Sequence, residues 1–356
     1  MTFDCIVAGT HLRHDGVPSR VHHLLERFAA HVPALFVEEP FCGSNERSTL
    51  VEEERLTVLR PVRRPFDTPP LDELTLDAVR GWLAGRKPLV WLSTPSMSEL
   101  PNAFVGAPLV YDCARDLAEI AYVPLDMRVR ERMLVERADL VFAASETLYD
   151  MYSRYGEHVR LAPSGVEFAS FARARALEPH ALLRHVSRPI AGYLGTIDER
   201  IDFEVVRALA ERMGTVVLAG PIARIDPAVL PRRANIHFTG QVEYADLPSL
   251  LSGFDVAIVP FGRASASAGV SPGQIAEYLA AGMPVVTTPL KEVRAEFGDL
   301  VTFADTPETF AAACEAVADR PEPARAEAGA ERARALDWDA LAANIWSDVV
   351  ALTEEV

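Results

Sequence analysis

The sequence predicts an α/β fold with two Rossmann-like domains, each built on a parallel β-sheet. Short apolar runs typical of buried strands alternate with helical patterns, and this alternation indicates βαβ units. The alternation stops near residue 165 and restarts near residue 188, and 356 residues suffice for two domains. We therefore expect an N-terminal domain over 1–168, a linker over 169–187 and a second domain over 188–337, with a C-terminal helix over 339–356 that packs back on the first domain.

The expected elements of the first half are short strands and two clear helices. Apolar, β-branched runs predict strands at 3–8, 34–37, 89–92, 109–111 and 140–144. Helical patterns cover 18–30, which has Pro and Ser in its first turn, and 129–138.

The second half repeats this order and ends in helices. Strands are expected at 190–195, 216–219, 236–239, 256–259 and 284–287, and helices at 203–212 and 308–318. Residues 320–327 are rich in Pro, Arg and Ala and are interpreted as a connection. The last helix begins near Trp338 because Leu341, Ile345, Val349 and Leu352 follow at helical spacing.

Composition excludes several classes of protein. With 49% apolar and 24% charged residues, the chain has the balance of a globular protein rather than a disordered one. The formal net charge of −16 disfavours nucleic acid as a partner. The four cysteines form no CxxC pair, so neither a disulfide framework nor a zinc site is expected. With no signal-peptide pattern and no long apolar run, we expect a cytoplasmic protein with reduced, mostly buried thiols.

Weak peripheral membrane contact is left open. Four arginines surround the predicted helix at 129–138, together with Met127, Val129, Met133 and Leu134. A basic amphipathic helix can lie on anionic lipid, whereas an ordinary solvated helix face is the alternative.

The loop after the first strand is a candidate binding segment. It runs from Gly9 to Ser19, contains Thr10, His14 and Gly16, and leads to a helix N-terminus that suits an anion. The acids Glu38 and Glu39 end the second strand, where a dinucleotide fold places its ribose-binding acid. Because the G-x-G-x-x-G fingerprint is missing, a nicotinamide cofactor is the weaker alternative.

The most informative segment runs from Ser271 to Val286. Ser271 is the expected N-cap of a helix with Pro272 at its first position, and its free N–H groups could hold a diphosphate. Glu277 lies about one and a half turns into this otherwise apolar helix. A carboxylate in such a setting needs a partner, and two ribose hydroxyls would satisfy it. A surface Glu on a short helix is the alternative.

Several segments resemble nucleotide-sugar-dependent glycosyltransferases of the two-domain GT-B fold, retaining family 4 type. Residues 277–286, EYLAAGMPVV, are similar to the family's "EYLAAGKPVV" signature. Further segments are similar to the subgroup of teichuronic acid biosynthesis glycosyltransferases and occur in the same order as in that subgroup. They are 111–116, 138–145, 163–167, 192–202 and 235–247. The resemblance covers most of the chain. It implies transfer of a sugar from a nucleoside-diphosphate donor, for which a UDP-sugar is expected, to a hydroxyl acceptor. The acceptor could be a glycan, a lipid-linked glycan or a small metabolite. No metal or other cofactor is implied.

The resemblance also implies roles for individual residues. Glu277 would hold the donor ribose, Arg200 would supply charge to the diphosphate, and Asp116 would position the acceptor. Further donor contacts would come from Gly195, Thr196, Gln241, Val242, Ser271, Pro272, Gly273 and Gln274. The acceptor side and the cleft would be lined by Thr10, His14, Gly16, Asp112 and Arg115.

The sequence departs from the family pattern near the phosphates. Gly269 and Gln274 stand where the resemblance leads one to expect Glu and Lys. The loss of a cation there weakens leaving-group stabilisation, for which Arg200 and Arg263 could compensate. A non-catalytic nucleotide-sugar-binding relative is therefore one alternative, and a nucleotide-sugar epimerase of the same architecture is another.

Overall fold

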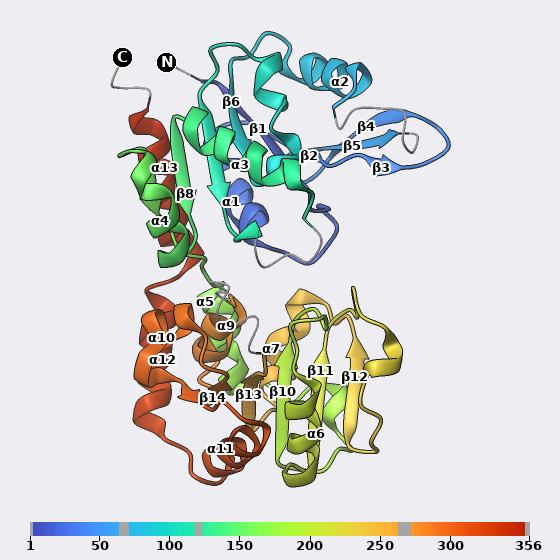
Figure 1. Ribbon diagram of the computed structural model, residues 1–356, viewed down its shortest axis with the longest axis vertical. Coiled ribbons are helices and arrows are strands. Elements are labelled where there is room, and N and C mark those ends of the chain that lie inside the picture. The colour runs from blue at the N-terminus through green and yellow to red at the C-terminus, as the bar shows by residue number, and fades with distance from the viewer. Residues whose placement is uncertain (1–2, 64–70, 118–122, 263–271, 353–356) are drawn as a thin grey trace. The chain divides into compact units, whose positions relative to one another are not determined.

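A computed structural model describes residues 3–63, 71–117, 123–262 and 272–352. The chain forms two compact units, each an α/β layer structure (Figure 1). The N-terminal unit comprises Met1–Ser164 together with Trp338–Val356, and the C-terminal unit comprises Gly165–Asp337. The predicted linker over 169–187 is wrong in this respect, because these residues belong to the C-terminal unit. They include most of helix α5 (Phe168–Ala172) and bury the Phe171 side chain.

The N-terminal unit is built on a nine-stranded sheet of order β3-β5-β2-β1-β6-β7-β8-β9, with β4 paired to β5. The β4–β5 pair is antiparallel and the other pairs are parallel. The strands are β1 (Cys5–Thr10), β2 (Ala34–Glu38), β3 (Phe41–Cys42), β4 (Arg47–Glu52), β5 (Thr57–Arg63), β6 (Pro88–Leu92), β7 (Leu109–Cys113), β8 (Leu140–Ala143) and β9 (Val159–Leu161).

Helices cover the sheet of the N-terminal unit. They are α1 (Arg20–Phe28), α2 (Glu73–Leu83), α3 (Leu125–Arg137), α4 (Glu146–Tyr152) and α13 (Trp338–Ala351). The last helix, α13, packs against α1 through aromatic contacts: His23 stacks on Trp338, and Phe28 lies 5.1 Å from Trp346 between ring centroids. Ile345 and Val349 enter the same core cluster, so the C-terminal segment completes this unit.

The C-terminal unit carries a six-stranded parallel sheet of order β12-β11-β10-β13-β14-β15. The reversal of strand order beside β10 is the arrangement of nucleotide-binding doubly wound folds, in which ligands bind beyond the carboxyl ends of the strands. The strands are β10 (Ile190–Leu194), β11 (Thr215–Ala219), β12 (Ile236–Gly240), β13 (Val256–Val259), β14 (Val285–Thr287) and β15 (Thr302–Phe303). The helices, besides α5, are α6 (Phe203–Arg212), α7 (Leu247–Leu251), α9 (Gln274–Ala280), α10 (Lys291–Phe297), α11 (Pro307–Asp319) and α12 (Pro323–Arg334).

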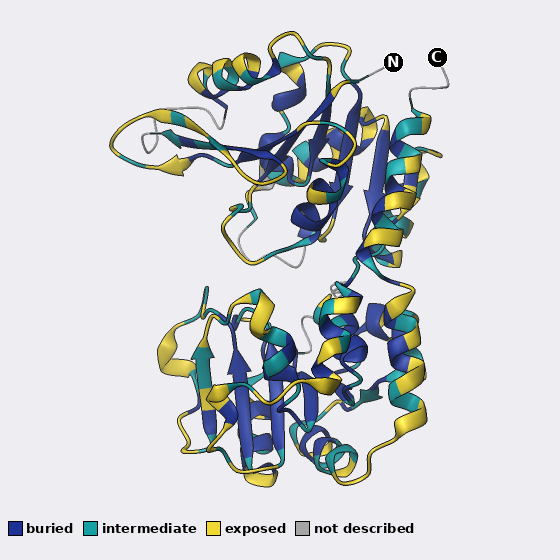
Figure 2. Cartoon of the chain, turned by 180° about the vertical axis from the view of Figure 1, so that it is seen from behind, coloured by how far each residue is buried: buried dark blue, intermediate teal, exposed yellow. Residues whose placement is uncertain are grey.

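Most of the strands that the sequence predicted are buried along their length. The central strands are dark blue along their length, whereas much of the β3–β4 region is yellow (Figure 2). Strand β4 is largely exposed, and in β5 the buried run ends at Leu59, before Arg60 and Pro61, so neither has the pattern of a long buried strand. The segment 320–327, expected as a connection, instead contains the start of α12. Its small alanines gave no apolar pattern, although Ala330 and Ala333 bury one face of the helix.

Three surface features bear on the expectations for localisation and partners. All four cysteines are free, with Cys42 exposed and the other three buried. No helix in the described part of the chain has the length and apolar character needed to cross a bilayer. On α3, Arg130 pairs with Asp126 and Arg132 with Glu136, which lowers the positive charge this helix presents.

Two glycine substitutions test the packing of the C-terminal core. A Cβ on Gly192, in the central strand β10, would lie 2.1 Å from the Phe254 ring, whereas a Cβ on Gly81 in helix α2 meets nothing within 4 Å. We expect Gly192→Ala to destabilise the protein by about 1–3 kcal/mol through overpacking. The control Gly81→Ala should stabilise it by about 0.5–1 kcal/mol through helix propensity. Urea unfolding measures both, and equal effects would contradict this account of the core.

Candidate functional site

Two glycines shape the carboxyl end of the C-terminal sheet. Gly195 follows β10 with φ +136° and Gly220 follows β11 with φ +149°, in a region that L side chains rarely adopt. A Cβ on Gly220 would lie 2.0 Å from the Gly195 carbonyl oxygen, so the two turns can approach only without side chains. A Cβ on Gly195 would also lie 2.9 Å from the Tyr193 hydroxyl, so this turn has room for glycine alone.

Helix α9 is anchored to this strand end. The buried Tyr278 hydroxyl accepts a hydrogen bond from the Leu194 N–H at 2.7 Å. The amide Nε2 of Gln274 would lie 3.4 Å from a Cβ placed on Gly195, so the start of the helix adjoins the glycine turn. The expected cap is corrected in part: α9 begins at Gln274 with Gly273 as N-cap, and Pro272 precedes it instead of occupying its first position. Ser271, Gly269 and Arg263 lie outside the described residues.

Glu277 is the ionisable group that stands out in this region. Its side chain is partly buried, and burial raises its pKa to about 8, opposed by a hydrogen bond from Tyr244. Within the described residues, that Tyr244 hydroxyl is its one hydrogen-bond partner, at the long distance of 3.4 Å to Oε1. A carboxyl group this poorly satisfied can accept hydrogen bonds from a pair of ligand hydroxyls.

The raised pKa of Glu277 predicts how stability depends on pH. The folded protein holds this proton up to about pH 8, whereas an unfolded Glu releases it near 4.5. The stabilising contribution of the protonated group is therefore complete below about pH 4.5 and is lost as pH rises through 8. We expect wild type to lose stability relative to Glu277→Gln between pH 5 and pH 9 in urea unfolding. A constant difference between the two proteins would show that the pKa is ordinary.

The loop after β12 lies beside Glu277. Gln241 is exposed and Val242 partly exposed, directly before the turn that holds Tyr244. Sequence reasoning named Gln241 and Val242 for the nucleobase but did not assign a role to Tyr244. Its position three residues after Gln241, within the matched segment 235–247, was the available signal.

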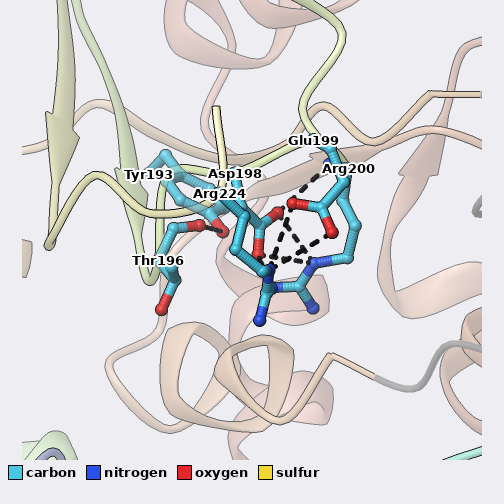
Figure 3. Close-up of polar contacts among 6 residues, drawn as sticks. All are labelled: Tyr193, Thr196, Asp198, Glu199, Arg200 and Arg224. Carbon is cyan, nitrogen blue, oxygen red and sulfur yellow. Dashed lines mark hydrogen bonds and ion pairs between the residues drawn. The ribbon is translucent and has the colours of Figure 1, made fainter. Parts of the chain in front are cut away.

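Arg200 is held by a neighbouring acid. The buried Asp198 carboxylate accepts from Nε of Arg200 at 2.9 Å and from its Nη2 at 2.8 Å. The same Oδ2 of Asp198 accepts from Nη2 of Arg224 at 2.7 Å, and Glu199 contacts the Nε of Arg224 (Figure 3). Arg200 therefore belongs to a four-residue cluster rather than acting as an isolated cation. Sequence reasoning missed Asp198 and Arg224, since Arg224 is 26 positions from its acid.

The loop after β1 in the N-terminal unit is fixed by a buried acid. Glu38 is fully buried and accepts from the His14 N–H at 3.0 Å, while its other oxygen lies 2.9 Å from Nη1 of Arg13. Thr10 is buried at the end of β1, and Gly16 is exposed in the loop. Because Glu38 is used within the unit, it does not offer a carboxylate to a dinucleotide ribose, which argues against the nicotinamide alternative.

The three residues expected on the acceptor side differ in exposure. Asp112 is completely buried and bonds Nε of Arg20 at 2.8 Å, so its expected place lining the acceptor side is corrected to a role inside the core. Arg115 is exposed and Asp116 partly buried, and both follow β7 on the loop after that strand. Asp116 lies near Glu131, whose pKa is raised, first by burial and also by the Asp116 charge.

Comparison with known proteins matches part of the C-terminal unit to a protein family. Residues 189–320, which include the glycine turns, Glu277 and the arginine cluster, match the family of group 1 glycosyl transferases. The Bacillus subtilis (strain 168) protein TuaH, which carries the name of a teichuronic acid biosynthesis glycosyltransferase, is 25% identical over 296 residues, covering 77% of this chain and 74% of TuaH. The chain is a glycosyltransferase. Its C-terminal unit contains the residues that the family match covers.

Solved structures show that this glycosyltransferase has the GT-B fold. A sucrose-phosphate synthase from Thermosynechococcus elongatus aligns with TM-score 0.73 at 19% identity, covering 99% of this chain and all of that one. Anabaena Alr3699/HepE in complex with UDP aligns with TM-score 0.68 at 15% identity over 98% of this chain and all of its own. An E. coli trehalose-6-phosphate structure bound with UDP-2-fluoro glucose gives TM-score 0.68 at 14% identity, covering 99% of each chain. At these identities the likeness concerns the fold.

Proposed function

We propose that this glycosyltransferase transfers a sugar from a UDP-sugar to a hydroxyl acceptor in the synthesis of a glycan or glycoconjugate. The observation that carries the proposal is Glu277, a partly buried carboxyl group on helix α9, whose first residue, Gln274, adjoins the Gly195 turn. A ribose offers two adjacent hydroxyl donors, which match the two oxygens of one carboxylate. Uridine as the base is supported by the UDP in Anabaena Alr3699/HepE and the UDP-2-fluoro glucose in the E. coli structure.

The chemistry asks the protein to stabilise a departing diphosphate. Charge develops on the phosphate oxygens as the anomeric bond breaks, and preorganised donors aimed at that charge are the main means of catalysis. The Gly195 N–H is already bonded to the Ala219 carbonyl at 2.9 Å, so the guanidinium of Arg200 is the proposed donor at the carboxyl end of β10. We propose that transfer proceeds without a metal ion and with retention at the anomeric carbon, as the family resemblance implies.

The acceptor would be bound by the N-terminal unit. The loop fixed by Glu38, which contains His14, and the loop after β7, which contains Arg115 and Asp116, carry polar side chains at carboxyl ends of strands. Asp116 is the proposed acceptor-positioning residue. The names of TuaH and of sucrose-phosphate synthase support a carbohydrate acceptor.

Release of the nucleoside diphosphate tests the proposal. The purified protein is incubated with UDP-glucose, UDP-galactose, UDP-glucuronate, GDP-mannose and ADP-glucose, with and without simple sugar and sugar-phosphate acceptors, in the presence of EDTA. We expect UDP release from at least one UDP-sugar, by transfer or by slow hydrolysis. If no donor turns over although UDP binds, the protein is a binding relative rather than an active transferase. Turnover that requires added Mg²⁺ would contradict the metal-independent step.

A further inference from the structure

The loops after β10 and β11 bring two arginines to one buried carboxylate. Nη2 of Arg200 and Nη2 of Arg224 both lie within hydrogen-bond distance of the same Asp198 oxygen (Figure 3). Asp198 is fully buried, whereas the Arg224 side chain is 52% exposed. Two guanidinium groups repel each other, so a fixed carboxylate between them holds them together where solvent and ligands can reach the second one.

The backbone holds Arg224 in an unfavourable conformation. Its φ is +58°, a value that costs a side-chain-bearing residue of order 1 kcal/mol or more. The surrounding loop imposes this conformation: the Ala223 N–H bonds the Ile197 carbonyl at 3.0 Å, and the Ile197 N–H bonds the Pro221 carbonyl at 2.9 Å. Strain of this kind persists where the surrounding structure fixes it, and it is concentrated at functional sites.

The arginine keeps donors for a ligand. Its Nη2 is engaged by Asp198 and its Nε by Glu199 at 3.3 Å. Within the described part of the chain these contacts leave its Nη1 for solvent or a ligand. From helix α9, the side chain that reaches Gly195 is the neutral Gln274. Among the described residues next to this turn, the guanidinium groups therefore come from the loops after β10 and β11.

We propose that Arg224 is a second cationic contact for the donor diphosphate, held beside Arg200 by Asp198. The inference rests on the proposed binding of a nucleoside diphosphate in the C-terminal unit. Arg224 binds the phosphates and Asp198 acts as a positioning residue for both guanidinium groups. A planar guanidinium with free N–H groups suits the oxygens of a diphosphate.

The test compares a ligand with phosphates and one without. Dissociation constants of UDP and of uridine are measured by calorimetry for wild type, Arg224→Asn, Arg224→Lys and Arg233→Gln. Asn tolerates the left-handed conformation, so Arg224→Asn should fold at least as well as wild type, which thermal unfolding without ligand checks. Arg233 is a matched control, because its side chain is 43% exposed and pairs with Glu211.

We expect Arg224→Asn to weaken UDP binding about tenfold or more, with uridine affinity changed less than twofold. Arg224→Lys should fall between, since it keeps the charge but not the planar geometry. Arg233→Gln should match wild type. Equal UDP affinity in wild type and Arg224→Asn would overturn the inference while leaving the proposed function in place. Failure of wild type to bind UDP or any other nucleoside diphosphate would instead overturn the proposed function, and this inference with it.

Discussion

Replacing Glu277 with Ala is expected to lower kcat/KM for the donor about 100-fold or more. A hydrogen bond to a charged group contributes about 1.5–3 kcal/mol, and two ribose hydroxyls would each make one with this carboxylate. Because the ribose is remote from the breaking bond, the loss should fall mainly on the donor KM. Steady-state kinetics at limiting donor measure the effect. Unchanged turnover under these conditions would remove Glu277 from the site.

The pKa of Glu277 gives this prediction a second readout. The free protein holds the group largely protonated at pH 7, because its pKa is raised to about 8. Ribose hydroxyls that donate to the carboxylate favour its charged form, so UDP binding should release a proton. UDP affinity of wild type should therefore rise from pH 6 to pH 8 and level off above, whereas that of Glu277→Gln should stay flat. Parallel pH profiles would contradict a carboxylate–ribose contact.

Removing Asp112 is expected to destabilise the N-terminal unit by about 3–5 kcal/mol. The Arg20 and Asp112 side chains are 5% and 1% exposed, and their ion pair joins the start of α1 to β7. Asp112→Ala would leave an uncompensated guanidinium in the core, and a buried unpaired charge is among the most destabilising changes known. Nη1 of Arg20 also bonds the Pro163 carbonyl at 2.8 Å, so the arginine cannot easily turn out to solvent.

Two further variants distinguish the cost of leaving Arg20 buried without its acid from the loss of an ordinary ion pair. In the described structure, Nη2 of Arg20 and Oδ2 of Asp112 are buried without a hydrogen-bond partner. The double variant Arg20→Met, Asp112→Leu should therefore recover most of the stability, because it removes both charges. Asp339→Ala, which breaks a pair whose acid is 83% exposed, should cost at most about 1 kcal/mol. If Asp112→Ala unfolds in urea like Asp339→Ala, the buried pair does not have this role.

The sequence predicted those features that depend on local patterns. Strands β10 and β13 are continuous apolar runs, and they were expected within one residue of their observed bounds. Glu277 drew attention because it is an acid on an otherwise apolar helix, and the structure finds it partly buried and poorly satisfied. Both inferences need only residues close together in the chain.

Features that depend on distant contacts could not be predicted. The family resemblance implied an acceptor-side role for Asp112, but its partner Arg20 lies 92 positions away in the chain and pairs with it in the core. Arg224 and Asp198 meet only because the loops after two adjacent strands lie side by side. Helix α12 was missed because the residues that bury its face, Gly329, Ala330 and Ala333, are small and form no run of large apolar residues.

Thermal unfolding with a panel of nucleotides tests whether Glu277 takes part in binding a nucleoside diphosphate. Wild type and the variant Glu277→Ala are each unfolded by heating in the presence of UDP, GDP, ADP, dTDP or NAD. A ligand at 100 times its dissociation constant stabilises the native state by about 2.7 kcal/mol, which is readily measured. We expect a clear rise in Tm with UDP for wild type and a much smaller rise for Glu277→Ala. Stabilisation by NAD alone, or an equal rise with UDP in both proteins, would contradict it.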